Sequence, residues 1–385
     1  MLPVSGTGSG VRRRRVRACH IIHSLQTGGA ERVLVGLAQV AAAEGIDLTV
    51  ISLMGASDYP YVAALRDTGI PVRVMSVASR WDPRILHRVE RVISQVQPDV
   101  LHSHLKHADI VGAYVGSRLQ IPLLSSLHLL EDAVSPVGRV KRRAGAEARN
   151  RTARFILPVS DHLRTWYLHT FPVDPERVRT LHNGISVPPP PPAAELDRRR
   201  AAFGIGEGSV TVAMIGVMRP GKGHMDLLAA CTRLPDGTQI NVVMAGDGPL
   251  RTEVEEAVAS DTRLRHMVRL LGHRDDIDAL LSVVDLVVHP SYADALPTAL
   301  IQAIGSGVPV LAYGVGGVPE IVSDREGVVV PVGDLGALTR SMTEICADPA
   351  RRATLGAAGR RRYEDEFTAA RWAQRLRELY LEARS

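Results

Sequence analysis

The chain has 385 residues, of which 45% are hydrophobic and 23% are charged. This composition is typical of a folded globular protein, and the length favours two domains of nearly equal size over a single core. The net charge is +5, but no basic segment is interleaved with aromatic residues, and no apolar run reaches the roughly 20 residues of a membrane-spanning helix, so neither a nucleic-acid partner nor a membrane span is expected.

The first 25 residues are basic and contain no long apolar segment and no clear cleavage site. We therefore expect a disordered tip followed by a strand, and no signal peptide. Cys19, Cys231 and Cys346 are too widely spaced for a disulfide framework or a metal motif. Both features suit the reducing cytosol, so a cytoplasmic location is predicted.

Apolar runs alternate with amphipathic stretches in the first half of the chain, which favours a doubly wound parallel sheet. Strands are predicted at residues 16–23, 47–53, 72–76, 100–102, 121–127 and 155–159. Helices are predicted at residues 30–44, 61–68, 83–96 and 108–119.

Five consecutive prolines occupy residues 188–192, and neither a helix nor a central strand tolerates such a run. We interpret residues 188–194 as a stiff linker between a first domain at 1–187 and a second domain at 195–366. Strands are predicted to resume at residues 210–216, 241–246, 268–271, 286–289, 308–312 and 327–330. A C-terminal helix at 367–385 completes this α/β arrangement.

The stretch from His289 to Val322 shows the pattern of a strand end, polar loop, helix, strand, glycine-rich loop and helix. In an open parallel sheet, ligands bind outside the carboxyl ends of the strands, where both loops would lie. Each loop leads into a helix whose first amides have no partner within the helix. Pro297 suits such a helix start because it has no N–H. The pattern predicts an anion site, with a diphosphate as its natural ligand.

The same stretch resembles the nucleotide-sugar signature of the retaining glycosyltransferases of family 4. That signature is a Glu followed by Gly-x-Pro and, eight residues after the first Glu, a second Glu. Asp294, Ala295, Pro297 and Gln302 stand at these positions. The resemblance spans nearly the whole chain and implies the GT-B fold, in which two Rossmann-like domains face a cleft and the C-terminal helix crosses back onto the first domain.

The resemblance also implies roles for these residues. The first acid, here Asp294, would bind hydroxyls of the donor sugar and stabilise positive charge at the anomeric carbon. Gln302 would hold the ribose hydroxyls. The residues Ala295, Leu296, Pro297 and Thr298 at the helix start would bind the diphosphate.

A second loop of the resemblance contains Lys222, the single lysine of the second domain. The family has Gly-Arg-x-x-x-x-Lys-Gly here, and its Arg and Lys grip the diphosphate. Lys222 and Gly223 match, whereas Val217 stands at the Arg position and Arg219 is the candidate replacement. In a chain that otherwise uses Arg, this lone Lys indicates a need for a compact point charge.

Gly28 and Gly29 begin a Gly-Gly-Ala-Glu-Arg run that resembles the family's first loop, where the donor diphosphate meets the acceptor. A simple tight turn is the alternative. The run is not the GxGxxG dinucleotide pattern, which argues against a nicotinamide cofactor. Gly272, His273 and Arg274 resemble the segment that brackets the nucleobase, mostly through its backbone.

Histidines gather at predicted strand ends. His128 matches a family histidine that contacts the donor sugar near the reacting carbon, although a histidine at a strand end is often structural. His102 and His104 would share a face if their strand continues, and with His107 they resemble a metal cluster. No Cys follows them at ligand spacing, and Asp109 is the sole nearby carboxylate, so we predict no metal site.

These features predict a metal-independent, retaining hexosyltransferase with Asp294, His128 and Lys222 as its catalytic residues. No cofactor is expected beyond the substrate, a UDP-sugar or GDP-sugar. The acceptor would be a hydroxyl of a glycan, a glycolipid or a small molecule, in cell-surface glycan assembly or in secondary metabolism. The rival interpretation is a non-catalytic GT-B protein that binds a nucleotide or glycan and scaffolds a partner enzyme.

Two basic runs, at residues 12–15 and 139–143, bear on the location of the protein. Such runs can hold an anionic membrane surface, which would place the protein peripherally at the inner face of the membrane. A solvated helix face or tail is the plainer interpretation.

Overall fold

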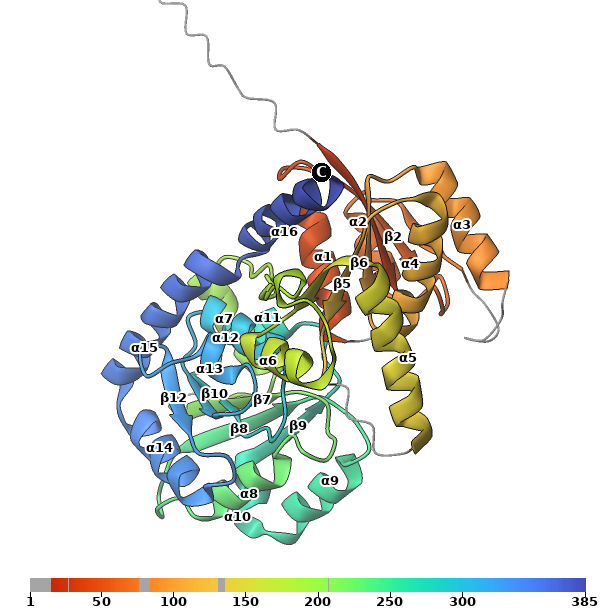
Figure 1. Cartoon of the computed structure of the whole chain (residues 1–385). Helices are drawn as coiled ribbons and strands as arrows, with labels where there is room; N and C mark the ends of the chain where they lie inside the picture. Colours follow the sequence, from red (N-terminus) through yellow and green to blue (C-terminus); the bar gives the residue numbers. More distant parts are fainter. Residues whose placement is uncertain (1–14, 27, 76–83, 131–135, 207) are drawn as a thin grey trace, which may run out of the picture.

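The computed structural model describes residues 15–26, 28–75, 84–130, 136–206 and 208–385 (Figure 1). Its first sheet contains β1 (Val16–Ile22), β2 (Ile46–Ser52), β3 (Val72–Val74), β4 (Val100–His104), β5 (Leu123–Leu127) and β6 (Ala153–Pro158). The helices of this half are α1 (Gly29–Ala41), α2 (Pro60–Asp67), α3 (Arg84–Val96), α4 (Lys106–Leu119), α5 (Pro136–Thr152) and α6 (Asp161–Thr170), followed by the short 3₁₀ turn Pro175–Arg177.

A second sheet contains β7 (Val210–Ile215), β8 (Ile240–Ala245), β9 (Val268–Gly272), β10 (Leu286–His289), β11 (Val310–Tyr313) and β12 (Gly327–Val330). The helices around it are α7 (Ala193–Ala202), α8 (His224–Thr232), α9 (Arg251–Ser260), α10 (Thr262–Met267), α11 (Ile277–Leu281), α12 (Thr298–Gly305), α13 (Val318–Ile321), α14 (Leu335–Ala347) and α15 (Pro349–Arg362). A π-helical turn, Tyr363–Phe367, joins α15 to α16 (Ala369–Arg384).

Both sheets are parallel and share one topology. Their strand orders are β3-β2-β1-β4-β5-β6 and β12-β11-β10-β7-β8-β9. In each, the first strand lies next to the fourth, so the order reverses between β1 and β4 and between β7 and β10. Ligands of doubly wound sheets bind outside the carboxyl ends of the strands at such reversal points. The predicted GT-B architecture, with two Rossmann-like sheets, is confirmed.

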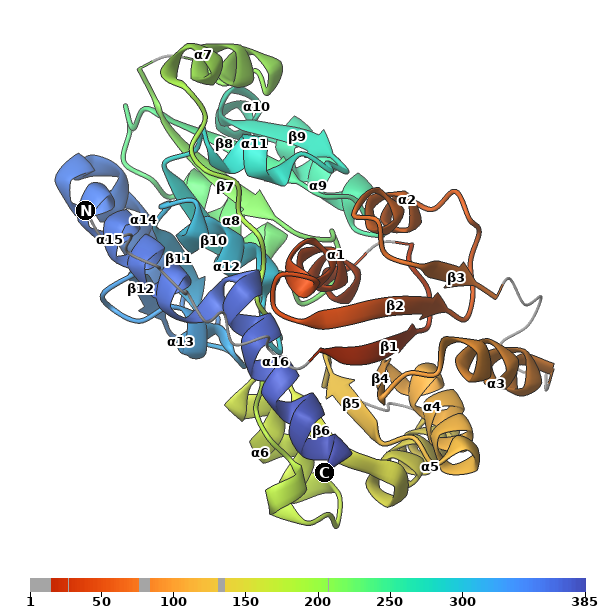
Figure 2. The same cartoon turned by 90° about the horizontal axis from the view of Figure 1, so that it is seen from above.

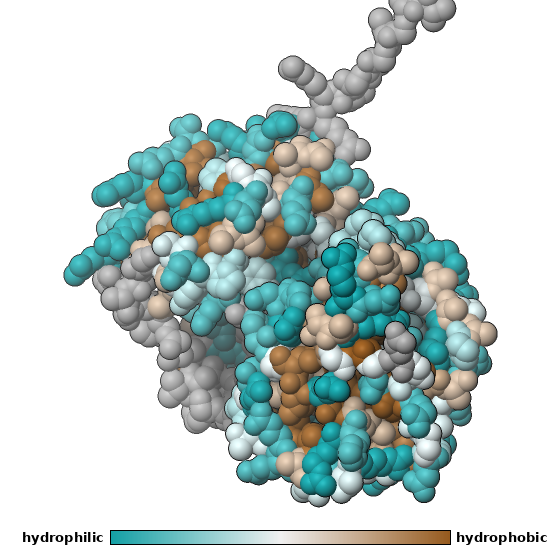
Figure 3. All heavy atoms as spheres, turned by 180° about the vertical axis from the view of Figure 1, so that it is seen from behind, coloured by the Kyte–Doolittle hydropathy of each residue, from teal (hydrophilic) through white to brown (hydrophobic). Residues whose placement is uncertain are grey.

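The C-terminal helix α16 leaves the second half and packs on the first, as predicted (Figure 2). It buries Trp372, Leu376 and Tyr380 against α1 and the first sheet. At the start of α16, the returning chain lies beside Ile185, near the end of the first half. There Ile185 N donates to Phe367 O (2.9 Å), and Ala369 N donates to Ile185 O (3.2 Å). From behind, the surface shows two lobes with a hollow between them (Figure 3).

The observed elements differ from the predicted ones at particular places. Strand β4 runs on to His104, and β5 begins at Leu123, after Pro122, which has no N–H for the sheet. Residues 136–152, for which the sequence indicated a basic run and no helix, form α5. That helix has few apolar residues, so it carries no periodic signal. Residues 12–14 and the side chains of Arg139 and Lys141 lie outside the described part of the structure.

Candidate active site

Two loops of the second half meet at the reversal point of its sheet. One follows β7 and carries Lys222, and the other follows β10 and carries Asp294. Gly223 lets them approach, because its φ is +77° and a Cβ there would lie 1.9 Å from Pro290 O. Tyr292 N also donates to Gly221 O (2.8 Å). Glycine at this position therefore brings the predicted lysine and carboxylate together.

Lys222, Asp294 and His289 form one partly buried ionic cluster. The Nζ of Lys222 lies 2.6 and 2.7 Å from the two carboxylate oxygens of Asp294. His289 Nε2 lies 2.8 Å from Asp294 Oδ2. Burial alone would raise the pKa of Asp294, but the hydrogen bond and charge of His289 and the ammonium of Lys222 lower it well below its ordinary range. Asp294 is therefore ionised at physiological pH.

His224 opens α8 next to this cluster, and its side chain is buried. Burial, together with the charges of Lys222 and His289, lowers its pKa to about 4. The ring is therefore neutral near pH 7, and its buried Nδ1 has no hydrogen-bond partner among the described residues. A neutral ring here leaves Lys222 as a compact positive charge that faces Asp294 on the loop after β10.

The glycine-rich loop after β11 supports Asp294 from the other side. Gly317 N donates to Asp294 O (3.2 Å), and Gly316, with φ +54°, comes so near that a Cβ would lie 1.7 Å from the same oxygen. Beyond Asp294, the buried residues Ala295 and Leu296 lead to Pro297, which caps α12. No side chain caps the first amides of this helix, so they can bind an anion.

The first domain reaches this site at the start of α1. A Cβ on Gly29 would lie 3.4 Å from Thr298 Oγ1, so the two predicted loops face each other across the domains. The Glu31 carboxylate folds back over Gly28, where a Cβ would be 2.3 Å from Oε2. Burial raises the pKa of Glu31, although a hydrogen bond to its own backbone opposes the shift.

Gln302 is buried and lies at the junction of the two domains. Its Nε2 donates to Asp278 Oδ1 (2.9 Å), and Asp278 Oδ2 accepts from Arg32 Nη2 of the first domain (2.9 Å). The amide is thus a donor to a carboxylate that also binds a cation from α1. A Glu at this position would bring a second negative charge against Asp278.

His128 lies just beyond the carboxyl end of β5 and is half-buried. Its Nε2 is 2.9 Å from His104 Nδ1. Burial lowers its pKa to about 4, and the negative charge of Asp109 opposes this shift only in part. His128 is therefore neutral near pH 7. Its Nδ1 has no partner among the described residues, so it is the atom available to a ligand.

The histidines suspected of forming a metal cluster are grouped differently from the expectation. His107 Nδ1 lies 3.1 Å from His23 Nδ1, away from the others. The third neighbour of His102 and His104 is His20, from β1, and ring nitrogens of these three lie within 4.8 Å of one another. The sequence could not identify His20, because only the pairing of β1 with β4 brings it there.

A second group close enough for a metal ion contains Asp161, His182 and Glu320. Glu320 accepts from the backbone N–H groups of Asp161 (2.7 Å) and His162 (2.9 Å) at the start of α6 and contacts His182 Nε2 (2.7 Å). Burial would raise the pKa of Glu320, but these hydrogen bonds lower it overall. The group acts as a bridge between the two domains.

The remaining predicted residues lie nearby on the second sheet. Gly246 N donates to Gly272 O (2.8 Å), which places the end of β9 beside the end of β8. His273 and Arg274 bond to the neighbouring Asp275 and Asp276. The side chain of Arg219 is exposed and has no partner among the described residues.

A cavity of about 380 Å³ opens between α1, the segment 185–188 and Asp278. It is lined by Arg32 and Tyr61 but by neither Lys222 nor Asp294. The ionic cluster is the candidate site for the chemistry, because it joins a fixed cation, an ionised carboxylate and a helix N-terminus at the sheet's reversal point.

Comparisons with known proteins agree with this geometry. Residues 196–362 match the family described as glycosyl transferases group 1, and residues 27–187 match glycosyltransferase family 4. Alpha-maltose-1-phosphate synthase of Mycolicibacterium smegmatis is 30% identical over 309 residues, which cover 73% of this chain and 78% of that protein. The chain belongs to the group 1, family 4 glycosyltransferases. The D-inositol 3-phosphate glycosyltransferase of Salinispora arenicola is 29% identical over 316 residues, covering 74% of this chain and 69% of that one.

Solved structures show the same fold. This glycosyltransferase superimposes on HepE of Anabaena, solved in complex with UDP and glucose, with a TM-score of 0.82 at 21% identity, covering 96% of this chain and 100% of the other. Among the described residues, no helix is both long and apolar enough to cross a membrane.

His289, His224 and Glu320 were not among the site residues predicted from the sequence of this glycosyltransferase. A signal was present for His289, since it ends a strand just before the diphosphate-site loop. His224 directly follows the Lys222-Gly223 pair. Glu320 carried no such signal, because its partners at the start of α6 lie about 160 positions earlier, at separations of 159 and 158 residues.

Proposed function

We propose that this glycosyltransferase moves a sugar from a UDP-sugar or GDP-sugar to an acceptor hydroxyl, with retention of anomeric configuration. The observation that carries the proposal is the contact of Lys222 with both oxygens of Asp294, beside the uncapped start of α12. A diphosphate is bound by such a fixed cation and by helix amides. Asp294 holds Lys222 in the position from which it would also contact the diphosphate.

Asp294 supplies the negative charge for the reacting centre. An oxocarbenium-like transition state needs a carboxylate close by, and the lowered pKa of Asp294 keeps it ionised. The shorter Asp side chain is accommodated, because the loop after β11 supports its backbone and His289 and Lys222 anchor its carboxylate. The support of Asp294 by its neighbours argues against the non-catalytic alternative.

A leaving phosphate oxygen would take the proton of the acceptor hydroxyl, so no side-chain base is required. The departing diphosphate would be neutralised by Lys222, the α12 amides and, across the cleft, the Gly28 and Gly29 region. We propose on this basis that no divalent metal is needed. Activity that is unchanged by EDTA supports this, and activity that is lost with EDTA and restored by Mg²⁺ or Mn²⁺ contradicts it.

The proposed acceptor is a cell-surface glycan or glycolipid, reached from the cytoplasmic side of the membrane. Basic residues of α5, among them the exposed Arg143, could dock the first domain on anionic lipid. Salt-sensitive sedimentation with anionic liposomes would support this. The names of the two curated relatives instead favour a small phosphorylated acceptor, and absence of liposome binding would favour that alternative, which includes secondary metabolites.

The transferase proposal is tested without knowing the acceptor, because hydrolysis of the donor needs only water. A thermal-shift screen of UDP, GDP, ADP and dTDP with their sugars selects the donor, since a ligand at about a hundred times its Kd adds roughly 2.7 kcal/mol. Asp294→Asn should then reduce hydrolysis strongly with little change in nucleotide binding.

The matched control is Asp285→Asn, before the opposite end of β10, where the carboxylate accepts from Thr211 N (2.8 Å). It should leave hydrolysis near the wild-type rate. Wild-type hydrolysis that Asp294→Asn does not alter would remove Asp294 from the mechanism, and no hydrolysis of any donor would favour the scaffolding alternative.

A further inference from the structure

A continuous chain of hydrogen bonds runs under the first domain's side of the cleft and ends at His128. Its members, in order, are Ser126, His102, Tyr380, His20, His104 and His128. The successive distances are 2.8, 2.7, 2.6, 2.9 and 2.9 Å. His20, His102, His104 and Tyr380 are fully buried. The chain therefore joins the C-terminal helix α16 to His128, the residue that the resemblance to family 4 places at the donor sugar.

The protons of this chain can point in only two ways. A neutral imidazole has one N–H donor and one bare acceptor nitrogen. The Tyr380 hydroxyl has one proton, so it donates to one of its two histidines and must accept from the other. If each bond has one donor, all protons point either toward His128 or toward Ser126. Toward His128, every ring carries its proton on Nδ1, and toward Ser126, every ring carries it on Nε2.

Ser126 selects between the two arrangements. Its side chain is nearly fully buried, and His102 Nε2 is its sole hydrogen-bond partner among the described residues. If Ser126 accepted from His102, its own proton would be buried without a partner, which is unfavourable because the desolvated hydroxyl gains no hydrogen bond. If Ser126 donates, that proton is paired, and the unpaired N–H falls at the far end, on Nδ1 of the half-buried His128.

Resting on the transferase proposed above, we propose that this chain is a positioning device. It presents His128 to the donor sugar as a neutral hydrogen-bond donor through Nδ1. His104 is the immediate positioning residue, because its Nδ1–H occupies His128 Nε2. Tyr380 passes the direction of the hydrogen bonds from His102 to His20. It lies 278 residues from His102 and 360 residues from His20 in the sequence.

The neutrality of the rings follows from their surroundings. Burial lowers the pKa of His20, His102 and His104 well below 6.5, and neighbouring histidines add to the shift. Every ring nitrogen of these three has a partner within the chain. A metal ion would have to break several of these bonds, so we favour the hydrogen-bond chain over metal ligation.

The first test needs no substrate. In protein labelled with ¹⁵N-histidine, long-range ¹H–¹⁵N correlations at pH 7 should show all four rings protonated on Nδ1. This is diagnostic, because free neutral histidine in water favours Nε2–H. Protonation of His128 on Nε2, or an even mixture of its two forms, would overturn the inference, as would stoichiometric zinc in the purified protein by mass spectrometry.

Tyr380→Phe breaks the chain at its middle with little change of shape. His102 should remain protonated on Nδ1, because Ser126 still donates to its Nε2. His20, His104 and His128 lose the Tyr380 proton that sets their direction, so part of their population should move to the Nε2 tautomer. Tyr167→Phe is the matched control, since Tyr167 is also fully buried but its hydroxyl bonds Asn150 and Arg149 outside the chain. It should shift no ring, and the same spectrum in both variants would contradict the chain.

The functional test compares two replacements of His104. Leu cannot donate to His128 Nε2, so His104→Leu should lower kcat for donor hydrolysis about tenfold with the donor KM within about twofold. Gln can donate through its amide, so His104→Gln should retain most of the wild-type kcat. Equal losses in both variants would mean a purely structural role. If the wild type hydrolyses no donor, the proposed function fails, and the tautomer measurement still decides the chain.

Discussion

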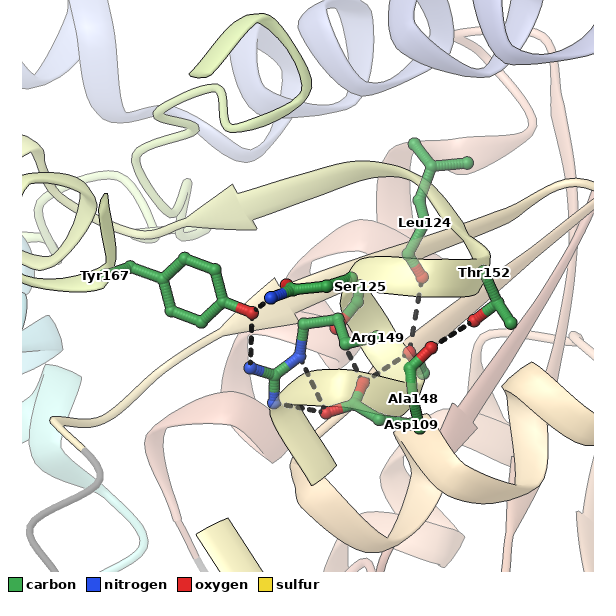
Figure 4. Close-up of polar contacts among 9 residues, drawn as sticks. Asp109, Leu124, Ser125, Ala148, Arg149, Thr152 and Tyr167 are labelled. Atoms are coloured by element: carbon green, nitrogen blue, oxygen red, sulfur yellow. Dashed lines mark hydrogen bonds and ion pairs between the residues drawn. The ribbon is translucent and has the colours of Figure 1, made fainter. Parts of the chain in front are cut away.

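Strands β4 and β5 carry two buried polar networks, one on each face, and the networks are built on different principles. On one face, the Asp109 carboxylate accepts from Ser103 Oγ (2.6 Å), Ser125 Oγ (2.6 Å) and both Nε (3.2 Å) and Nη2 (2.6 Å) of Arg149 (Figure 4). On the other face, His102, His104 and Ser126 belong to the neutral chain. Period-two alternation separates the two sets.

The two networks differ in what determines which group donates and which accepts in each hydrogen bond. In the Asp109–Arg149 network, fixed charges determine which group donates, and both side chains are almost completely buried. Such a pair is an anchor that cannot rearrange without a large cost. In the histidine chain, no member is charged, and the direction depends on the proton of one serine hydroxyl. The charged face therefore stabilises the sheet, and the neutral face can serve the active site.

The largest expected difference between the two faces is the loss of stability that the histidine face causes at acidic pH. Burial lowers the pKa of His128 to about 4 and also lowers the pKa values of His20, His102 and His104, against 6.5 in the unfolded chain. Below pH 6.5 the unfolded state therefore binds more protons than the folded state. Each such histidine lowers the free energy of unfolding by about 1.4 kcal/mol for every unit by which the pH decreases. Above pH 6.5 this loss is absent.

Urea unfolding at pH 7.0 and pH 5.5 measures this slope. A free energy of unfolding that changes by less than the contribution of one histidine over this interval would show that the rings are already charged in the fold. The neutral chain would then be wrong.

Breaking the charged face should have the next largest effect. Arg149→Met leaves the Asp109 carboxylate buried without its cation, which should lower the free energy of unfolding by about 3–5 kcal/mol. The control is Arg151→Ala on the same helix, whose partner Glu147 lies 2.8 Å away on the surface. That exposed pair should contribute about 1 kcal/mol or less. Similar losses in the two variants, by urea unfolding, would mean that Arg149 is no anchor.

Lys222→Ala tests the ionic cluster of the second domain. It should weaken the binding of a nucleoside diphosphate about ten- to hundredfold, because a charge-assisted hydrogen bond contributes about 1.5–3 kcal/mol. Calorimetric titration with UDP and with uridine, or with GDP and guanosine, provides an internal control. A variant that loses affinity equally for nucleoside and diphosphate would place Lys222 outside the phosphate site.

The smallest effect is expected at Gln302. Gln302→Glu should alter donor affinity by about 1 kcal/mol or less, since ribose hydroxyls pair with either group. It should also reduce stability, because the new carboxylate would face Asp278, to which the amide now donates. Adding Asp278→Asn should restore part of that loss. A double-mutant cycle by urea unfolding measures the coupling, and strictly additive changes would contradict the contact.

Local patterns in the sequence were sufficient for the architecture and for much of the site. Alternating apolar strands and amphipathic helices indicate two parallel sheets, because each buried strand must be covered on both faces. Glycines and prolines at strand ends mark the loops that approach an anion. The α12 start was identifiable because the carboxyl ends of neighbouring parallel strands share one edge. Asp294 and Lys222 were identified through the resemblance to family 4. Strand alternation likewise put His102 and His104 on a common face.

Only the tertiary structure decided which of these groups are partners. The sequence suggested His107 as the neighbour of His102 and His104, but the pairing of β1 with β4 places His20 there. The return of α16 places Tyr380 between His20 and His102. Folding also gave Asp294 a second partner in His289 and turned Gln302 toward Asp278. Hydrogen-bond partners depend on angles and distances of an ångström or less between segments that are far apart in the chain. Residue type and spacing set the available donors and acceptors, whereas packing sets their pairing.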